Sequence, residues 1–184
     1  MLDIDTPFAS TEPVAYLGGS VRPPAREHSI RRAQPAPDAE VRLTLTDPAV
    51  RVVTDFVWEQ PVTVLARRSI DGALEEMMRA GVGALLVVRD EVIIGLITSL
   101  DIQRAAGDAR YDDIEVGHIM TPWERVPTLD WQALARARVF DVAACFQSVP
   151  ASHIVLVEHA DQGGTFVRGL VSRTRLLRQL GHSV

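Results

Sequence analysis

The chain has 184 residues, 47% of them apolar, and a formal net charge of −5. This size and composition favour a globular protein with one domain or two small ones. The acidic balance argues against a nucleic-acid partner, and no apolar run approaches the roughly 18 residues that cross a bilayer, so no membrane segment is expected. The acidic start of the sequence has no apolar signal region, which predicts a cytoplasmic protein.

Residues 1–46 are predicted to form an extended, proline-rich arm. Six prolines fall within the first 40 residues, and each proline fixes φ and removes a hydrogen-bond donor. We expect a solvated tail, with docking onto a partner or a second copy of the chain as the alternative. Order is expected to begin in a lead-in helix within residues 47–60, with Asp47 as the N-cap and Pro48 at the first helical position.

From there the sequence runs twice through the order strand, helix, strand, strand, helix. In the first unit, residues 61–64 form a strand, and Ser69 caps a helix that ends at Gly81. Residues 83–97 contain two nearly continuous apolar strands, which are typical of a sheet that is buried on both faces. A helix over about residues 99–106 closes the unit. The helix after Ser69 has one apolar face, made by Ile70, Ala73, Leu74, Met77 and Met78.

The second unit repeats this pattern. It begins with a strand at 126–129, followed by one long helix that carries the apolar residues from Trp131 to Phe146. Two paired strands lie within residues 153–171, and a closing helix runs from about 173 to 180. The motif of glycine, two apolar residues and a hydroxyl residue occurs at 95–98 and again 74 residues later, at 169–172. We therefore expect two domains, at residues 61–116 and 117–184.

A single cysteine, Cys145, excludes an internal disulfide. It lies within an apolar helical pattern, so core packing is favoured over a reactive thiol. The histidines show no zinc-type spacing with cysteine, which argues against a metal site.

Two segments carry a family resemblance. In residues 95–102, a glycine, two apolar residues, a threonine and, three residues on, Asp101 look like the end of a CBS (cystathionine-beta-synthase-type) domain. His118-Ile119-Met120-Thr121-Pro122 resembles the segment that introduces a following CBS domain. Over about residues 47–182 the chain is similar to bacterial stand-alone pairs of CBS domains, also called Bateman modules.

This resemblance implies a fold, a ligand and an assembly. The fold would be α/β, with two β-α-β-β-α CBS domains related by a pseudo-twofold axis and preceded by the extended arm. The clefts between the domains would accept AMP, ADP, ATP or S-adenosylmethionine. The helical faces would form a homodimer.

Thr98 and Asp101 are the candidate ribose-binding residues. A ribose presents two neighbouring hydroxyl donors, and one carboxylate can accept hydrogen bonds from both. The spacing Thr-x-x-Asp also fits a helix capping box, in which both side chains bond only to backbone donors. The family resemblance favours ribose binding, and the capping box is the alternative.

The remaining site residues follow from the same resemblance. Val62, Val64, Ala84 and Leu85 would form walls around the adenine, and Arg173 or Arg104 would meet the phosphates, unless these arginines are only solvated. In the second unit Ser172 keeps the hydroxyl, but Arg175 takes the place of the aspartate. Because an arginine has only donors, it cannot accept from ribose hydroxyls, and it would need a compensating anion. We therefore expect one adenosine site per chain, with the second cleft empty or altered.

The expected function is a regulatory adenine-nucleotide sensor without catalytic activity. Because the sequence contains no effector domain, its output would pass through a dimer interface or an unidentified effector protein. The alternative is a structural dimerisation or interaction module that binds no ligand.

Overall fold

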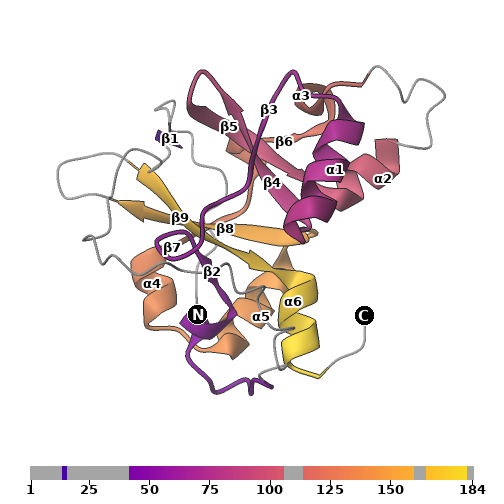
Figure 1. Cartoon of the computed structure of the whole chain (residues 1–184). Coiled ribbons are helices and arrows are strands. Elements are labelled where there is room, and N and C mark those ends of the chain that lie inside the picture. Colours follow the sequence, from indigo (N-terminus) through magenta and orange to yellow (C-terminus); the bar gives the residue numbers. More distant parts are fainter. Residues whose placement is uncertain (1–13, 16–41, 106–113, 160–164, 182–184) are drawn as a thin grey trace, which may run out of the picture.

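The computed structural model describes residues 14–15, 42–105, 114–159 and 165–181. Most of the predicted arm, residues 1–46, lies outside the described residues. The fold is mixed α/β, as predicted, and it contains two units stacked in Figure 1. Among the described residues, no helix combines the length and the apolar character needed to span a bilayer.

The first unit forms the predicted elements. Ser69 Oγ accepts a hydrogen bond from Gly72 N at 3.2 Å and so caps the first helix, and Gly81 ends that helix with a φ of 68°. Ile70, Ala73 and Met77 of this helix are buried, but Met78 is 68% exposed, so the apolar face of the helix is only partly covered by the core. The elements are β3 (Thr63–Leu65), α1 (Ile70–Ala80), β4 (Ala84–Arg89), β5 (Val92–Thr98) and α2 (Ser99–Ala105).

The second unit differs from the prediction in its helical part, where two helices replace the single long one. Ala137 O accepts from Ala49 N at 3.0 Å, and Val139 N donates to Asp47 O at 2.9 Å. Because these backbone groups pair with the lead-in segment, they cannot continue a helix. The elements are β7 (Thr128–Asp130), α4 (Trp131–Ala135), α5 (Val139–Ser148), β8 (His153–His159), β9 (Thr165–Ser172) and α6 (Arg173–Gln179).

The lead-in helix predicted within residues 47–60 is also wrong. The structure has a single 3-10 turn, η1 (Ala49–Val52), followed by the short strand β2 (Thr54–Asp55). The Asp47 carboxylate caps no helix; it accepts from Thr44 N at 2.7 Å and closes its own turn. Pairing of β2 with β9 draws the following backbone into an extended conformation.

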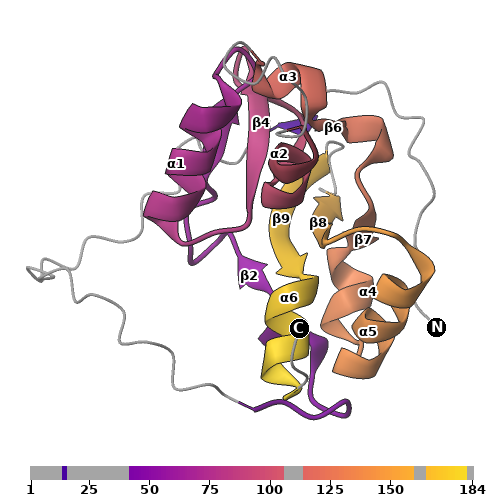
Figure 2. The same cartoon turned by 90° about the vertical axis from the view of Figure 1, so that its right-hand side faces the viewer.

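The segment that precedes each unit forms a short strand that pairs with the other unit. β2, which precedes the first unit, pairs with β9 of the second. The linker between the units contains α3 (Val116–Ile119), β6 (Thr121–Pro122) and the 3-10 turn η3 (Trp123–Arg125), and β6 pairs with β5 of the first unit. Figures 1 and 2 show β2 against the yellow β9 and α6, and β6 beside the first unit.

The two units share one pattern of strand pairing. β3 is parallel to β4, which is antiparallel to β5; β7 is parallel to β8, which is antiparallel to β9. A bulge interrupts both hairpins at the same place, between Val87 and Val88 and between Leu156 and Val157. The described strand β1 (Val14–Ala15) pairs with β5 and β9 and so joins the two halves into one sheet. The repeat is thus confirmed at the level of pairing, while the pseudo-twofold axis stays a prediction.

Three apolar cores hold these elements. One lies beneath the helices of the first unit, and a second lies beneath those of the second unit and includes the buried Cys145. Burial raises the pKa of the Cys145 thiol, as expected for a core cysteine. The third core joins the units through strand residues of both, among them Leu86, Leu96, Val155 and Val167.

Candidate functional site

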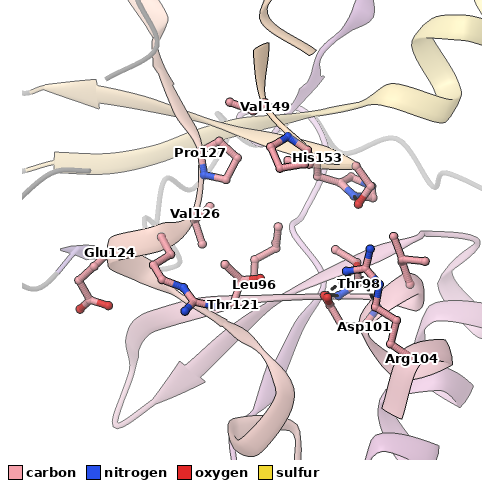
Figure 3. Close-up of a pocket in the computed structure, with 15 residues that line it drawn as sticks. Leu96, Thr98, Asp101, Arg104, Thr121, Glu124, Val126, Pro127, Val149 and His153 are labelled. Carbon is pink, nitrogen blue, oxygen red and sulfur yellow. Dashed lines mark hydrogen bonds between the residues drawn. The ribbon is translucent and has the colours of Figure 1, made fainter. Parts of the chain in front are cut away.

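A cavity of about 490 Å³ lies between the two units at the end of β5 (Figure 3). The first unit contributes the corner where β5 meets α2, with Leu96, Thr98 and Asp101. The linker contributes Thr121 and residues 124–127, and the second unit contributes residues 149–153. The structure therefore places both predicted ribose-binding residues in a cavity that neither unit could form alone.

Thr98 and Asp101 form a capping box at the start of α2. Asp101 Oδ2 accepts from Thr98 N at 2.9 Å and from Thr98 Oγ1 at 2.7 Å, while Asp101 N donates to Thr98 Oγ1 at 3.3 Å. The capping box that was the alternative to ribose binding for this pair is thus present. It uses only one carboxylate oxygen, and Oδ1 of Asp101 accepts no hydrogen bond from the described residues. Capping and ligand binding are compatible in this geometry, because each carboxylate oxygen has its own lone pairs.

Charged side chains surround the cavity in balanced number. Asp101 and Arg104 lie on α2, and Glu124 and Arg125 lie on η3. Arg104, Glu124 and Arg125 are exposed and make no hydrogen bond or ion pair with any described residue. These three side chains are therefore available to a bound molecule.

His153, the first residue of β8, lines the cavity opposite Asp101 (Figure 3). Only 8% of the residue is exposed. Burial lowers the pKa of its imidazole to about 4, although the nearby Asp101 carboxylate acts to raise it. Sequence reasoning assigned no role to His153. His153 begins β8 and is the pairing partner of Ser172 in β9. This position beside the repeated hydroxyl residue is the signal that could have drawn attention to it.

The four predicted adenine walls do not line this cavity. Val64 and Leu85 belong to the core of the first unit, Val62 packs against that core, and Ala84 lies in the core between the units. All four residues belong to the same unit as Asp101, the unit in which the adenine walls were expected. Because the linker crosses over, its residues Val126 and Pro127 line the cavity instead.

Arg173 also lies away from this cavity. Its guanidinium donates to the carbonyl oxygens of Phe146 and Val149 and lies 5.3 Å from the centre of the Phe146 ring. It lines a different cavity, of about 590 Å³, between α5 and α6. Arg173 therefore satisfies carbonyl groups after α5, and of the two predicted phosphate-binding arginines only Arg104 lies beside Asp101.

The equivalent corner of the second unit is built differently. Ser172 Oγ accepts from Arg175 N at 3.4 Å, so Ser172 caps α6 as Thr98 caps α2. The Arg175 guanidinium donates to Thr54 Oγ1 at 3.0 Å, across to the segment that precedes the first unit. This partner is a neutral hydroxyl, and among the described residues no carboxylate pairs with the Arg175 guanidinium. Arg175 thus spans the corner that Asp101 leaves open in the first unit.

Among the described residues, no group of three or more His, Cys, Asp or Glu side chains is placed to hold a metal ion.

Comparison with known proteins finds one matching family model and several similar solved structures. A model of the CBS domain matches residues 53–108. The fold is similar to that of a conserved protein from Pyrococcus horikoshii, which is 22% identical with a TM-score of 0.56, over 77% of this chain and 98% of that one. A crystal structure of a CBS domain is 26% identical with a TM-score of 0.51, over 65% of this chain and 86% of that one.

A third solved structure was determined with a ligand. The CBS domain of a bacterial magnesium transporter of the CNNM/CorC family, in complex with ATP, is 13% identical with a TM-score of 0.53, over 76% of this chain and 91% of that one. No protein of curated function matches this chain. Residues 53–108 therefore match the CBS domain, and over about two thirds of the chain the fold is similar to that of CBS-domain structures.

Proposed function

We propose that the chain is a regulatory module that binds one adenine nucleotide, in the cavity beside Asp101. CBS domains are regulatory modules that bind adenosine ligands, and this chain has their fold. The observation that carries the proposal is the position of Asp101 at a cavity between the units, with Oδ1 free. The proposal includes no catalytic step, and turnover of nucleotide by the purified protein would contradict it.

The cavity offers groups suited to each part of an adenosine nucleotide. Asp101 Oδ1 can accept from the ribose hydroxyls. Leu96, Val126 and Pro127 provide an apolar surface for the base. Arg104 or Arg125 can pair with phosphate oxygens, since neither guanidinium has a partner among the described residues. The ATP complex of the CNNM/CorC CBS domain supports a nucleotide as the ligand class.

A homodimer or partner interface on the helical faces would carry the output. Three large apolar side chains on the described α-helices are exposed: Met78 of α1 by 68%, Leu100 of α2 by 40% and Phe140 of α5 by 59%. We propose that a second copy or an effector binds at these helices, because association there would remove these side chains from water.

A thermal-shift titration tests the binding proposal. AMP, ADP, ATP and S-adenosylmethionine are added to the full chain at about 100 times the dissociation constant, where one site adds about 2.7 kcal/mol of stability. For a domain of this size we expect the melting temperature to rise by roughly 5–10 °C. Calorimetric titration should then give one nucleotide per chain. A stoichiometry of two would contradict the closed corner at Arg175.

Variants of Asp101 separate binding from helix capping. Asp101→Ala should weaken nucleotide binding by about ten- to a hundredfold, because it removes charge-assisted hydrogen bonds worth about 1.5–3 kcal/mol. Asp130→Ala is the matched control. Asp130 Oδ1 caps α4 by accepting from Ala133 N at 2.8 Å, and Asp130 does not line the cavity. Equal affinity in the wild type and Asp101→Ala would move the site elsewhere.

A structural dimerisation module without ligand is the second candidate function. The capping box at Thr98 and Asp101 favours it, because this contact alone gives both residues a structural role. Under this alternative no adenine nucleotide or S-adenosylmethionine changes the melting temperature, while the protein still dimerises.

A further inference from the structure

His153 combines near-complete burial with an unsatisfied ring nitrogen. Nδ1 lies 3.0 Å from Ser152 Oγ, whereas Nε2 has no hydrogen-bond partner among the described residues. The facing residue of the first unit is Gly83, and a Cβ added there would lie 3.6 Å from Cε1 and 3.8 Å from Nε2. Gly83 has no such atom, so no side chain from this position covers that edge of the ring. Of the described residues, only Gln179 has a side-chain nitrogen or oxygen that is both fully enclosed and without a hydrogen-bond partner, so Nε2 of His153 is not fully enclosed and remains accessible to a bound molecule.

The charged groups around His153 do not provide the missing partner. The Asp101 carboxylate interacts with the imidazole electrostatically, but no hydrogen bond joins the two side chains. Arg104, Glu124 and Arg125 line the same cavity without contacting the ring. On the side of α6, Arg173 N donates to Ser152 O, but its guanidinium is directed to the carbonyls of Phe146 and Val149.

We propose that His153 Nε2 donates a hydrogen bond to a phosphate oxygen of the bound nucleotide, and that phosphate binding is coupled to the uptake of one proton from solvent by this imidazole. In the imidazolium both ring nitrogens carry a proton. Nδ1 then donates to Ser152 Oγ, and Nε2 donates to the phosphate. This inference rests on the proposed function, because it assigns a regulatory property to the same site.

The direction of the pH effect follows from the two states. Without ligand the imidazole is neutral above about pH 4, because burial lowers its pKa to about 4. A phosphate within hydrogen-bond distance stabilises the charged form and raises that pKa. The affinity for a phosphorylated ligand therefore increases as the pH falls through the pKa of the complex. Adenosine, which has no phosphate, lacks this coupling at His153.

Proton-resolved NMR of the histidine rings tests the coupling in the full chain. The His153 signal is assigned by its absence from the spectra of His153→Gln or His153→Asn, so that either variant suffices. We expect the wild-type signal to titrate near pH 4 alone, and its midpoint to rise by at least one pH unit with saturating AMP. Saturating adenosine should leave the midpoint unchanged.

Calorimetric titration provides a second measurement. Because AMP itself takes up a proton near pH 6, the quantity to compare is the affinity of the wild type divided by that of His153→Gln. We expect this ratio to rise severalfold between pH 7 and pH 4.5, the range in which the imidazole of the complex takes up its proton. The matched control is His159→Gln, because His159 lies at the other end of β8 and outside the cavity. The AMP affinity of the wild type divided by that of this variant should not change with pH.

The outcomes distinguish the two proposals. If AMP binds and the His153 midpoint does not move, the coupling is wrong while the nucleotide-binding proposal stands. If AMP binds with an affinity ratio that does not depend on pH, the coupling is likewise overturned. If no nucleotide binds at any pH between 5 and 8, both proposals fail.

Discussion

Arg175 stands where the first unit has Asp101, and the two side chains use their corners in different ways. Thr98 pairs with Ala84 on the neighbouring strand, and Ser172 pairs with His153 in the same register. Despite this equivalence, Asp101 keeps one oxygen free beside a cavity, whereas Arg175 reaches Thr54. A difference of one residue type therefore makes the two corners unequal, while the expectation of one adenosine site per chain stays a prediction.

Gly95 and Gly169 are also equivalent, and each allows another backbone to approach closely. A Cβ on Gly169 would lie 2.6 Å from the carbonyl oxygen of Thr54, and a Cβ on Gly95 would clash with the carbonyl oxygen of Thr121. These carbonyls belong to β2 and β6. The glycines are required because the crossing strands pack directly against them.

We predict that Gly95→Ala and Gly169→Ala each lower the free energy of unfolding by about 1–3 kcal/mol, because a backbone shift must relieve the clash. Urea denaturation measures this change. Gly72→Ala is the control: its added methyl meets only the flexible Arg68 side chain and lies within a helix, so we expect a neutral or stabilising effect of up to about 1 kcal/mol. Unchanged stability in both strand variants would contradict the close approach.

Among the elements, β2 is held to the second unit by pairing with β9, by the Arg175 side chain and by an ion pair with Arg168. Arg168 of β9 makes two hydrogen bonds to the Asp55 carboxylate, both at 3.0 Å, and a third to Glu158 Oε2 at 3.0 Å. Its guanidinium also lies 4.3 Å from the centre of the Trp131 ring. Burial acts to raise the pKa of the Asp55 carboxyl, but hydrogen bonds from Arg168 and Val57 N outweigh it and the pKa is lowered.

A lowered carboxyl pKa gives a stability contribution that is present above the unfolded value of about 4 and is lost as the pH falls through the folded value. We predict that Asp55→Asn costs about 1.5–3 kcal/mol at pH 7. The difference from the wild type should shrink as the pH falls below about 4. Urea denaturation across this range measures the effect, with the exposed Glu59→Gln as control. A difference that does not depend on pH would show that Asp55 contributes nothing as a charged group.

The predicted elements agreed with the structure where local pattern decides the conformation. The Ser69 cap, the helix end at Gly81 and the apolar strand pairs depend on neighbouring residues, and all are present. The lead-in helix and the single long helix of the second unit were wrong. In both cases distant backbone groups, such as Ala49 N and Ala137 O, form hydrogen bonds that helix propensity does not include.

At the scale of the whole molecule, the two units share a core and exchange strands. The third apolar cluster contains buried residues of both units, and each of β2 and β6 pairs across the boundary. Neither unit has a complete set of backbone partners by itself. The same exchange explains why the lining of the cavity could not be assigned from the sequence: Val126 and Pro127 reach the cavity because the linker crosses to the first unit.

We predict that the two units unfold in one cooperative transition. Differential scanning calorimetry should give a single peak whose calorimetric enthalpy equals the van't Hoff enthalpy, because the shared core cannot persist when one unit unfolds. Two resolved transitions would show that the units are independently stable.

The central claim is that Asp101 binds the ribose of one nucleotide in the cavity between the units. A crystal structure of the full chain with AMP tests it most directly. We predict that both ribose hydroxyls lie within hydrogen-bond distance of the Asp101 carboxylate, while Oδ2 keeps its bonds to Thr98. Nucleotide bound at the Arg175 corner, with no ligand beside Asp101, would contradict the account.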